Sequence, residues 1–117
     1  MTSEGKIAIV TGAAGWIGSA IARRLAADGA TVVVCDVRLE PAEQVASAIV
    51  ADGGQALAIE TDVRSVPSIE AMVASVVERF GRVDQLVNVA GGSARERAST
   101  VHGSSEEVIR EIIEMNL

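Results

Sequence analysis

The chain has 117 residues, enough for one domain with a buried core, and 49% of them are hydrophobic. A net charge of −6 argues against a nucleic-acid partner, because phosphate contacts need clustered cations. No run of about 18 apolar residues predicts a membrane span, and the N-terminus lacks the pattern of a signal peptide. With Cys35 as the single cysteine, we expect a reduced, cytoplasmic protein with no metal site.

The first chemical signal is a strand that passes through a glycine-rich turn into a helix. Residues 7–10 form a β-branched apolar run, typical of a parallel strand buried on both faces. Apolar residues then recur at helical spacing from Ile17 to Leu25, and Asp28-Gly29 ends the helix. The first turn of a helix has unpaired N–H groups and the positive end of the dipole. The stretch 12–18 therefore predicts a phosphate site, and it includes Trp16 and Ile17 at the start of the helix.

Three glycines at a spacing of three shape this turn. Gly12 is expected to allow a tight turn, Gly15 the close approach of the backbone to a pyrophosphate, and Gly18 the close packing of helix against strand. A P-loop is excluded, because no Gly-Lys-Ser/Thr follows and the only lysine, Lys6, precedes the strand.

The remaining chain alternates strands and helices. Strands are predicted at 30–36, 55–61 and 84–89, and helices at 41–51, from Ser65 or Ser68 to Phe80, and from 104 onward, after a polar loop at 93–102. Short connections between such elements give a parallel sheet with right-handed crossovers. We therefore expect one α/β domain over 1–117, a Rossmann-type doubly wound sheet of order 3-2-1-4 that is incomplete at its C-terminal side.

The second strand ends on a carboxylate. Asp36 lies about 20 positions beyond the glycine turn, where an acid binds the adenosine ribose hydroxyls of a dinucleotide. The alternative is that Asp36 caps a loop or the next helix. Arg38 could balance the extra phosphate of NADP, but Asp36 would repel it, so NAD is favoured over NADP. Asp62 and the Ala90-Gly91 pair also follow strands, and the ligand crevice is expected at these strand ends.

Thr11-Gly12-Ala-Ala-Gly15-Trp16-Ile-Gly18 resembles the cofactor turn of the short-chain dehydrogenase/reductase family, Thr-Gly-x-x-x-Gly-x-Gly. Trp16 stands where the commonest form has glycine, and the spacing is nearer to the extended branch of that family. The remainder is more similar to the shorter branch. The resemblance implies an oxidoreductase that acts on an alcohol or ketone.

The resemblance also implies roles for later residues. Asp62-Val63 resembles the pair whose carboxylate and N–H contact the adenine. Asn88-Val89-Ala90-Gly91 resembles the family's Asn-Asn-Ala-Gly, in which the first Asn braces the sheet and the Ala-Gly backbone lies along the nicotinamide ribose. The resemblance therefore implies that Asn88, Ala90 and Gly91 belong to the cofactor site. Asn116 resembles the Asn that holds a helix distortion and a water of the proton relay.

Two consequences concern the chain as a whole. The family's acid/base tyrosine, lysine and serine lie beyond Leu117, and the sequence contains no tyrosine, so the chain alone is expected to bind cofactor rather than to catalyse. The last helix lies in a subunit interface in the family, which implies a homo-oligomer.

Three functions remain open from the sequence. The first is an NAD-dependent alcohol or carbonyl oxidoreductase. The second is a non-catalytic nucleotide-binding or assembly module. The third is a Rossmann-like methyltransferase, which fits less well because its glycines usually read Gly-x-Gly-x-Gly.

Overall fold

The computed structural model describes residues 3–90. Its elements are β1 (Ile7–Thr11), α1 (Trp16–Ala27), β2 (Thr31–Asp36), α2 (Leu39–Ala51), β3 (Gln55–Glu60), α3 (Val66–Phe80) and β4 (Gln85–Asn88). The predicted polar loop at 93–102 and the predicted helix from 104 lie outside the described residues, as do Gly91 and Asn116.

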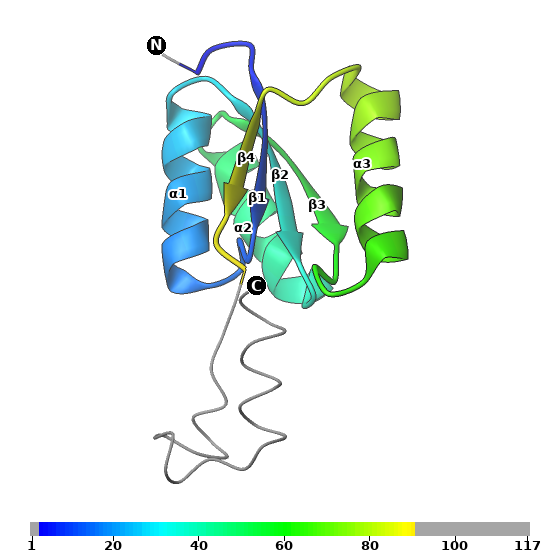
Figure 1. The fold of residues 1–117 in the computed structure, drawn as a ribbon. Helices are drawn as coiled ribbons and strands as arrows, with labels where there is room; N and C mark the ends of the chain where they lie inside the picture. Colours follow the sequence, from blue (N-terminus) through cyan, green and yellow to red (C-terminus); the bar gives the residue numbers. More distant parts are fainter. Residues whose placement is uncertain (1–2, 91–117) are drawn as a thin grey trace, which may run out of the picture.

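The four strands form one parallel sheet of order β3-β2-β1-β4 (Figure 1), which confirms the predicted topology. α1 and α2 pack on one face, against alternate side chains of β1 and β2 such as Val10 and Val34. α3 packs on the other face, where Met72 and Val76 contact Ile9 and Val33. Because both faces of the central strands are covered, β1 is buried along its whole length, as its unbroken apolar sequence predicts.

The helix boundaries differ slightly from those predicted. α2 begins at Leu39, two residues before Pro41, because a proline is tolerated in the first turn, where its missing N–H would have no helical partner. α3 uses both serines proposed for its start. Ser65 is the N-cap and accepts a hydrogen bond from the Ser68 N–H at 3.3 Å, while the Ser68 hydroxyl accepts from the Asp62 N–H at 2.9 Å.

Asp84 aligns β4 with β1. Its Oδ2 accepts from the Ile7 N–H at 2.8 Å and from Arg82 Nε at 2.9 Å, and its own N–H donates to the Ile7 carbonyl at 2.9 Å. The bond from Ile7, with help from Arg82, holds the pKa of the Asp84 carboxyl below its ordinary value. This contact sets the register in which Thr11 and Asn88 meet at the far end of the two strands.

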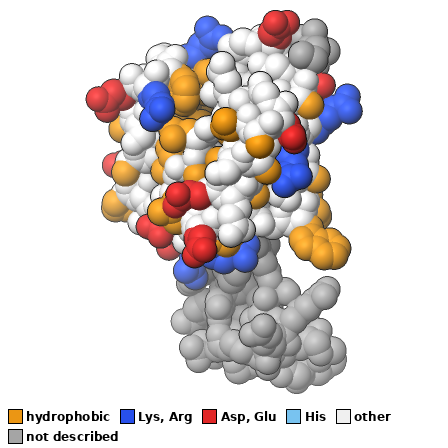
Figure 2. All heavy atoms as spheres, turned by 180° about the vertical axis from the view of Figure 1, so that it is seen from behind, with side chains coloured by type: hydrophobic (Ala, Val, Ile, Leu, Met, Phe, Trp, Pro, Cys, Tyr) orange, Lys and Arg blue, Asp and Glu red, His pale blue; other side chains and the backbone are white. Residues whose placement is uncertain are grey.

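The surface of the described residues carries charges of both signs. Acidic and basic side chains are interspersed over the face drawn in Figure 2, and some form local pairs such as Arg24–Asp28 at 3.3 Å. Within residues 3–90, no helix is long and apolar enough to cross a bilayer. The same residues contain no group of three or more His, Cys, Asp or Glu side chains placed to hold a metal ion.

The buried thiol of β2 makes stability depend on pH. Cys35 is 1% exposed, and its burial raises the thiol pKa from 9.0 to about 11, with the Thr61 hydrogen bond opposing and the Asp36 charge assisting. The folded state therefore binds this proton more tightly than the unfolded state does. The contribution of the protonated Cys35 thiol to stability is complete below pH 9.0 and is lost as the pH rises toward 11.

We expect urea denaturation to give an unfolding free energy that falls between pH 9.0 and about 11. The fall should be smaller in Cys35→Ala, whose overall stability is lower but whose buried site no longer titrates. Equal slopes in the two proteins over this interval would contradict the assignment to Cys35.

Candidate functional site

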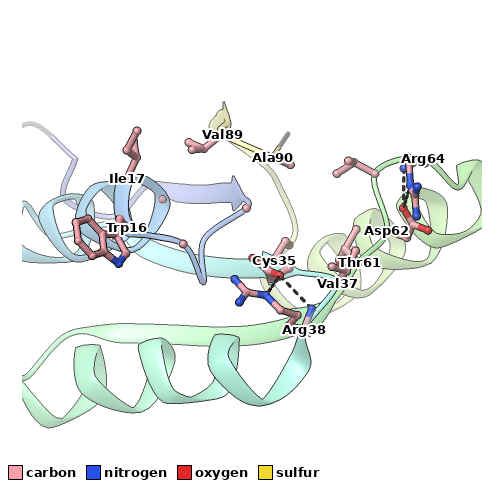
Figure 3. Close-up of a pocket in the computed structure, with 15 residues that line it drawn as sticks. Trp16, Ile17, Cys35, Val37, Arg38, Thr61, Asp62, Arg64, Val89 and Ala90 are labelled. Atoms are coloured by element: carbon pink, nitrogen blue, oxygen red, sulfur yellow. Dashed lines mark hydrogen bonds and ion pairs between the residues drawn. The ribbon is translucent and has the colours of Figure 1, made fainter. Parts of the chain in front are cut away.

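A pocket of about 510 Å³ lies at the carboxyl edge of the sheet (Figure 3). Four segments line it: the glycine turn with the start of α1, the ends of β2 and β3 with the residues that follow them, and Val89-Ala90 after β4. This is the crevice expected from the strand ends. The pocket brings together nine of the predicted site residues: Gly12, Gly15, Trp16, Ile17, Gly18, Asp36, Asp62, Val63 and Ala90.

The backbone conformation and a close neighbouring residue both require glycine at position 12. Its φ of +65° belongs to the left-handed region, and a Cβ there would lie 2.7 Å from the Ala90 nitrogen. The tight turn and the contact between the ends of β1 and β4 therefore both need a glycine at this position.

The other two glycines, Gly15 and Gly18, differ in how much space a Cβ atom would have. A Cβ at Gly18 would lie 2.8 Å from Ala13 Cα and would overlap the Gly12 carbonyl oxygen. Gly18 thus packs α1 against the turn itself, rather than against the strand as predicted. A Cβ at Gly15 would meet only the Gly12 oxygen, at the ordinary distance of 3.5 Å, so no contact within the described chain requires glycine there.

The start of α1 presents open donors to the pocket. Gly15 is the N-cap and has no side chain to satisfy the first turn. The N–H groups of Trp16, Ile17 and Gly18 donate to no atom of residues 3–90, and all three residues line the pocket. A helix N-terminus with free donors attracts an anion through these groups and through the helix dipole.

Asp36 joins the glycine turn to the connection between β2 and α2. Its side chain is 7% exposed. Oδ2 accepts from the Ala14 N–H at 3.1 Å, and Oδ1 accepts from the Arg38 N–H at 3.0 Å and from Arg38 Nε at 3.4 Å. Because Arg38 is the N-cap of α2, Asp36 does hold a loop, as its alternative interpretation proposed. A role in binding ribose stays a prediction beside this structural one.

The sequence Asp-Val-Arg occurs twice, at the end of β2 and after β3. Asp62 Oδ1 accepts from the Arg64 N–H at 2.9 Å and from Arg64 Nε at 3.4 Å, the same arrangement as at Asp36. The backbone bond from Arg64, more than its guanidinium, holds the pKa of the Asp62 carboxyl below its ordinary value. Val37 and Val63, the central residues of the two sequences, both line the pocket. The repeated triplet is the signal that could have identified Arg64 and Val37.

Thr11 was missed as a site residue. Its hydroxyl oxygen accepts from the Val89 and Ala90 N–H groups, each at 3.2 Å, and its proton is donated to Asn88 Oδ1 at 3.4 Å. Thr11 therefore fixes the backbone of the pocket wall after β4. Asn88 lies in this bracing network and does not line the pocket, so its predicted contact with a cofactor stays untested.

The pocket also has a buried floor that the sequence analysis did not assign. Cys35 and Thr61 both line it and are almost fully buried. Thr61 donates its N–H to the Asp36 carbonyl at 2.9 Å, which ties the end of β3 to the end of β2. Cys35 and Thr61 could have been identified from the sequence, because they lie at strand ends next to Asp36 and Asp62.

Comparisons with known proteins agree with this geometry. The family model described as short chain dehydrogenase matches residues 6–117. A 2,3-dihydro-2,3-dihydroxybenzoate dehydrogenase of Bacillus subtilis is 42% identical over 104 residues, which are 89% of this chain and 39% of that protein.

Solved structures extend the likeness to the fold. A hydroxysteroid dehydrogenase from Escherichia coli superposes with a TM-score of 0.87 and 36% identity, covering 97% of this chain and 47% of that one. A metagenomic short-chain oxidoreductase in complex with NADP gives a TM-score of 0.86 and 36% identity, covering 97% and 51%. The chain spans about half the length of these relatives or less. Because the family model matches residues 6–117, the chain belongs to the short-chain dehydrogenase family.

Proposed function

We propose that this chain is the cofactor-binding part of an oxidoreductase that transfers a hydride between NAD and an alcohol or carbonyl substrate. The observation that carries the proposal is the set of open N–H groups of Trp16, Ile17 and Gly18, facing the pocket that also contains Asp36. Family membership supports the oxidoreductase class and removes the methyltransferase alternative.

A dinucleotide fits the lining residues in order. Asp62 and Val63 would hold the adenine, and Asp36 would bind the adenosine ribose. The pyrophosphate accepts from the first turn of α1, with Gly15 leaving room for it. The backbone of Ala90 and Gly91 would hold the nicotinamide ribose. When bound, the nicotinamide supplies or accepts the hydride, and this chain's own residues hold and orient it.

The charge at Asp36 supports NAD over NADP. Its carboxylate is nearly buried, and a 2′-phosphate on the ribose would meet it directly. Arg38 is the group that would favour NADP, and it is paired with Asp36 at 3.4 Å. NADP binding by the metagenomic relative keeps this cofactor as the competing choice.

Catalysis requires groups that these 117 residues do not supply. The sequence has no tyrosine, and Lys6 precedes β1, at the edge of the sheet opposite the pocket. The chain alone therefore binds cofactor without turnover, and Asn116 is proposed as a relay residue of the complete enzyme. We further propose a cytoplasmic homo-oligomer. The exposed apolar side chains of Val73, Val77 and Leu86, on α3 and β4, support association.

Calorimetric titration with NAD and NADP tests the cofactor. We expect the 117-residue chain to bind NAD more tightly than NADP. Asp36→Asn should lose this preference by about tenfold or more, because the negative charge is gone while an oxygen remains to accept from Ala14. Asp52→Asn, an exposed change at the end of α2, is the control and should bind as the wild type does. A folded wild-type chain that binds neither nucleotide would overturn the proposal.

Two alanine substitutions separate binding from folding. Gly15→Ala should fold with a stability close to that of the wild type, because its methyl group meets no close atom, yet it should bind NAD at least about tenfold more weakly. Gly18→Ala should lose roughly 1–3 kcal/mol of stability, because its methyl group overlaps the turn. Urea denaturation and calorimetry measure the two effects. Unchanged NAD affinity in Gly15→Ala would show that no phosphate approaches this backbone.

A further inference from the structure

Trp16 is an apolar side chain with no packing role in the described chain. It is the only tryptophan in the sequence, and the residue is 95% exposed although it lines the pocket. The turn needs only the backbone of this residue. Burying an indole has a large favourable free energy, which an exposed tryptophan does not gain. The position of Trp16 at the pocket therefore requires an explanation.

Trp16 follows the part of the glycine turn that contacts Asp36. The Ala14 N–H, two residues earlier, donates to Asp36 at 3.1 Å, so the turn connects Trp16 to the carboxylate proposed to bind ribose. Cα–Cβ bonds of a helix tilt toward its N-terminus, which directs Trp16 toward this end of α1. Figure 3 shows the ring beside the glycine turn, on the opposite side of the pocket from Asp62 and Arg64.

The first turn of α1 is held in place around Trp16. The Ser19 hydroxyl donates to the Trp16 carbonyl at 3.2 Å, and the Ser19 N–H donates to the Gly15 carbonyl at 2.9 Å. The backbone is thereby fixed, while the side chain is 95% exposed and makes no hydrogen bond to residues 3–90. Trp16 is free to change rotamer without disturbing the donors of the turn.

We propose that Trp16 is a cofactor-contact residue that closes over the adenosine ribose and the adjacent phosphate when a dinucleotide binds. This inference rests on the proposed function. The indole face packs on the apolar face of the sugar and removes water from the phosphate. With water excluded, the hydrogen bonds from Ile17 and Gly18 to the phosphate gain strength. Trp16 thus sets affinity for adenosine-containing nucleotides and takes no part in hydride transfer.

The intrinsic fluorescence of Trp16 reports this closure directly. Titration of the chain with NAD or ADP-ribose should move the emission to shorter wavelength and saturate. Nicotinamide mononucleotide, which lacks the adenosine, should leave the emission unchanged. The control is the double variant Trp16→Phe with Val50→Trp, which places an exposed reporter at the far end of α2 and should show no shift with any ligand.

Affinity for ADP-ribose, measured by calorimetry, gives the second readout. Trp16→Ala should bind about tenfold more weakly, and Trp16→Phe within about twofold of the wild type, because phenylalanine keeps an aromatic face. Both variants should unfold at the wild-type temperature, since the side chain is exposed.

The outcomes separate the two proposals. Binding of NAD without a spectral shift, or with equal affinity in Trp16→Ala, would overturn the role of Trp16 and leave the proposed function standing. No binding of NAD or ADP-ribose by the folded chain would overturn both.

Discussion

The close approach of Gly12 to Ala90 is the constraint on which the pocket depends. Two backbone segments, one after β1 and one after β4, come together with no side chain between them, since a Cβ on Gly12 would lie 2.7 Å from the Ala90 nitrogen. Thr11 completes the junction by accepting from two N–H groups of the β4 end. The strands meet where the sheet order changes direction, and a ligand crevice opens at such a point in parallel sheets.

Asp36 adds a second junction, between the glycine turn and the end of β2. A nearly buried carboxylate is tolerated because N–H groups of Ala14 and Arg38 donate to it, which offsets the loss of hydration. The same bonds hold the glycine turn against the end of β2. The donors of α1 are therefore positioned before any ligand arrives, and little ordering is left to be done on binding.

Much of this arrangement could be predicted from residue patterns. Unbroken β-branched runs and helical periodicity were enough for the strand order, because short βαβ connections permit few topologies. Local side-chain bonds were not predictable in the same way. The Thr11 bridge depends on β1 and β4 lying side by side across 77 or more residues, and the partner of Gly18 depends on the path of the turn. The family motif implied that Asn88 braces the sheet, but it did not identify Thr11 as the partner.

The paired Asp-Val-Arg connections have an electrostatic consequence for a chain of net charge −6. Each carboxylate at the pocket has its own arginine on the same short connection, at 3.4 Å, so the four charges sum to zero at the mouth. The proposed dinucleotide, itself an anion, would therefore meet no net negative charge from these four groups. Its attraction would come from oriented peptide dipoles at short range, which added salt screens far less than it screens separated surface charges.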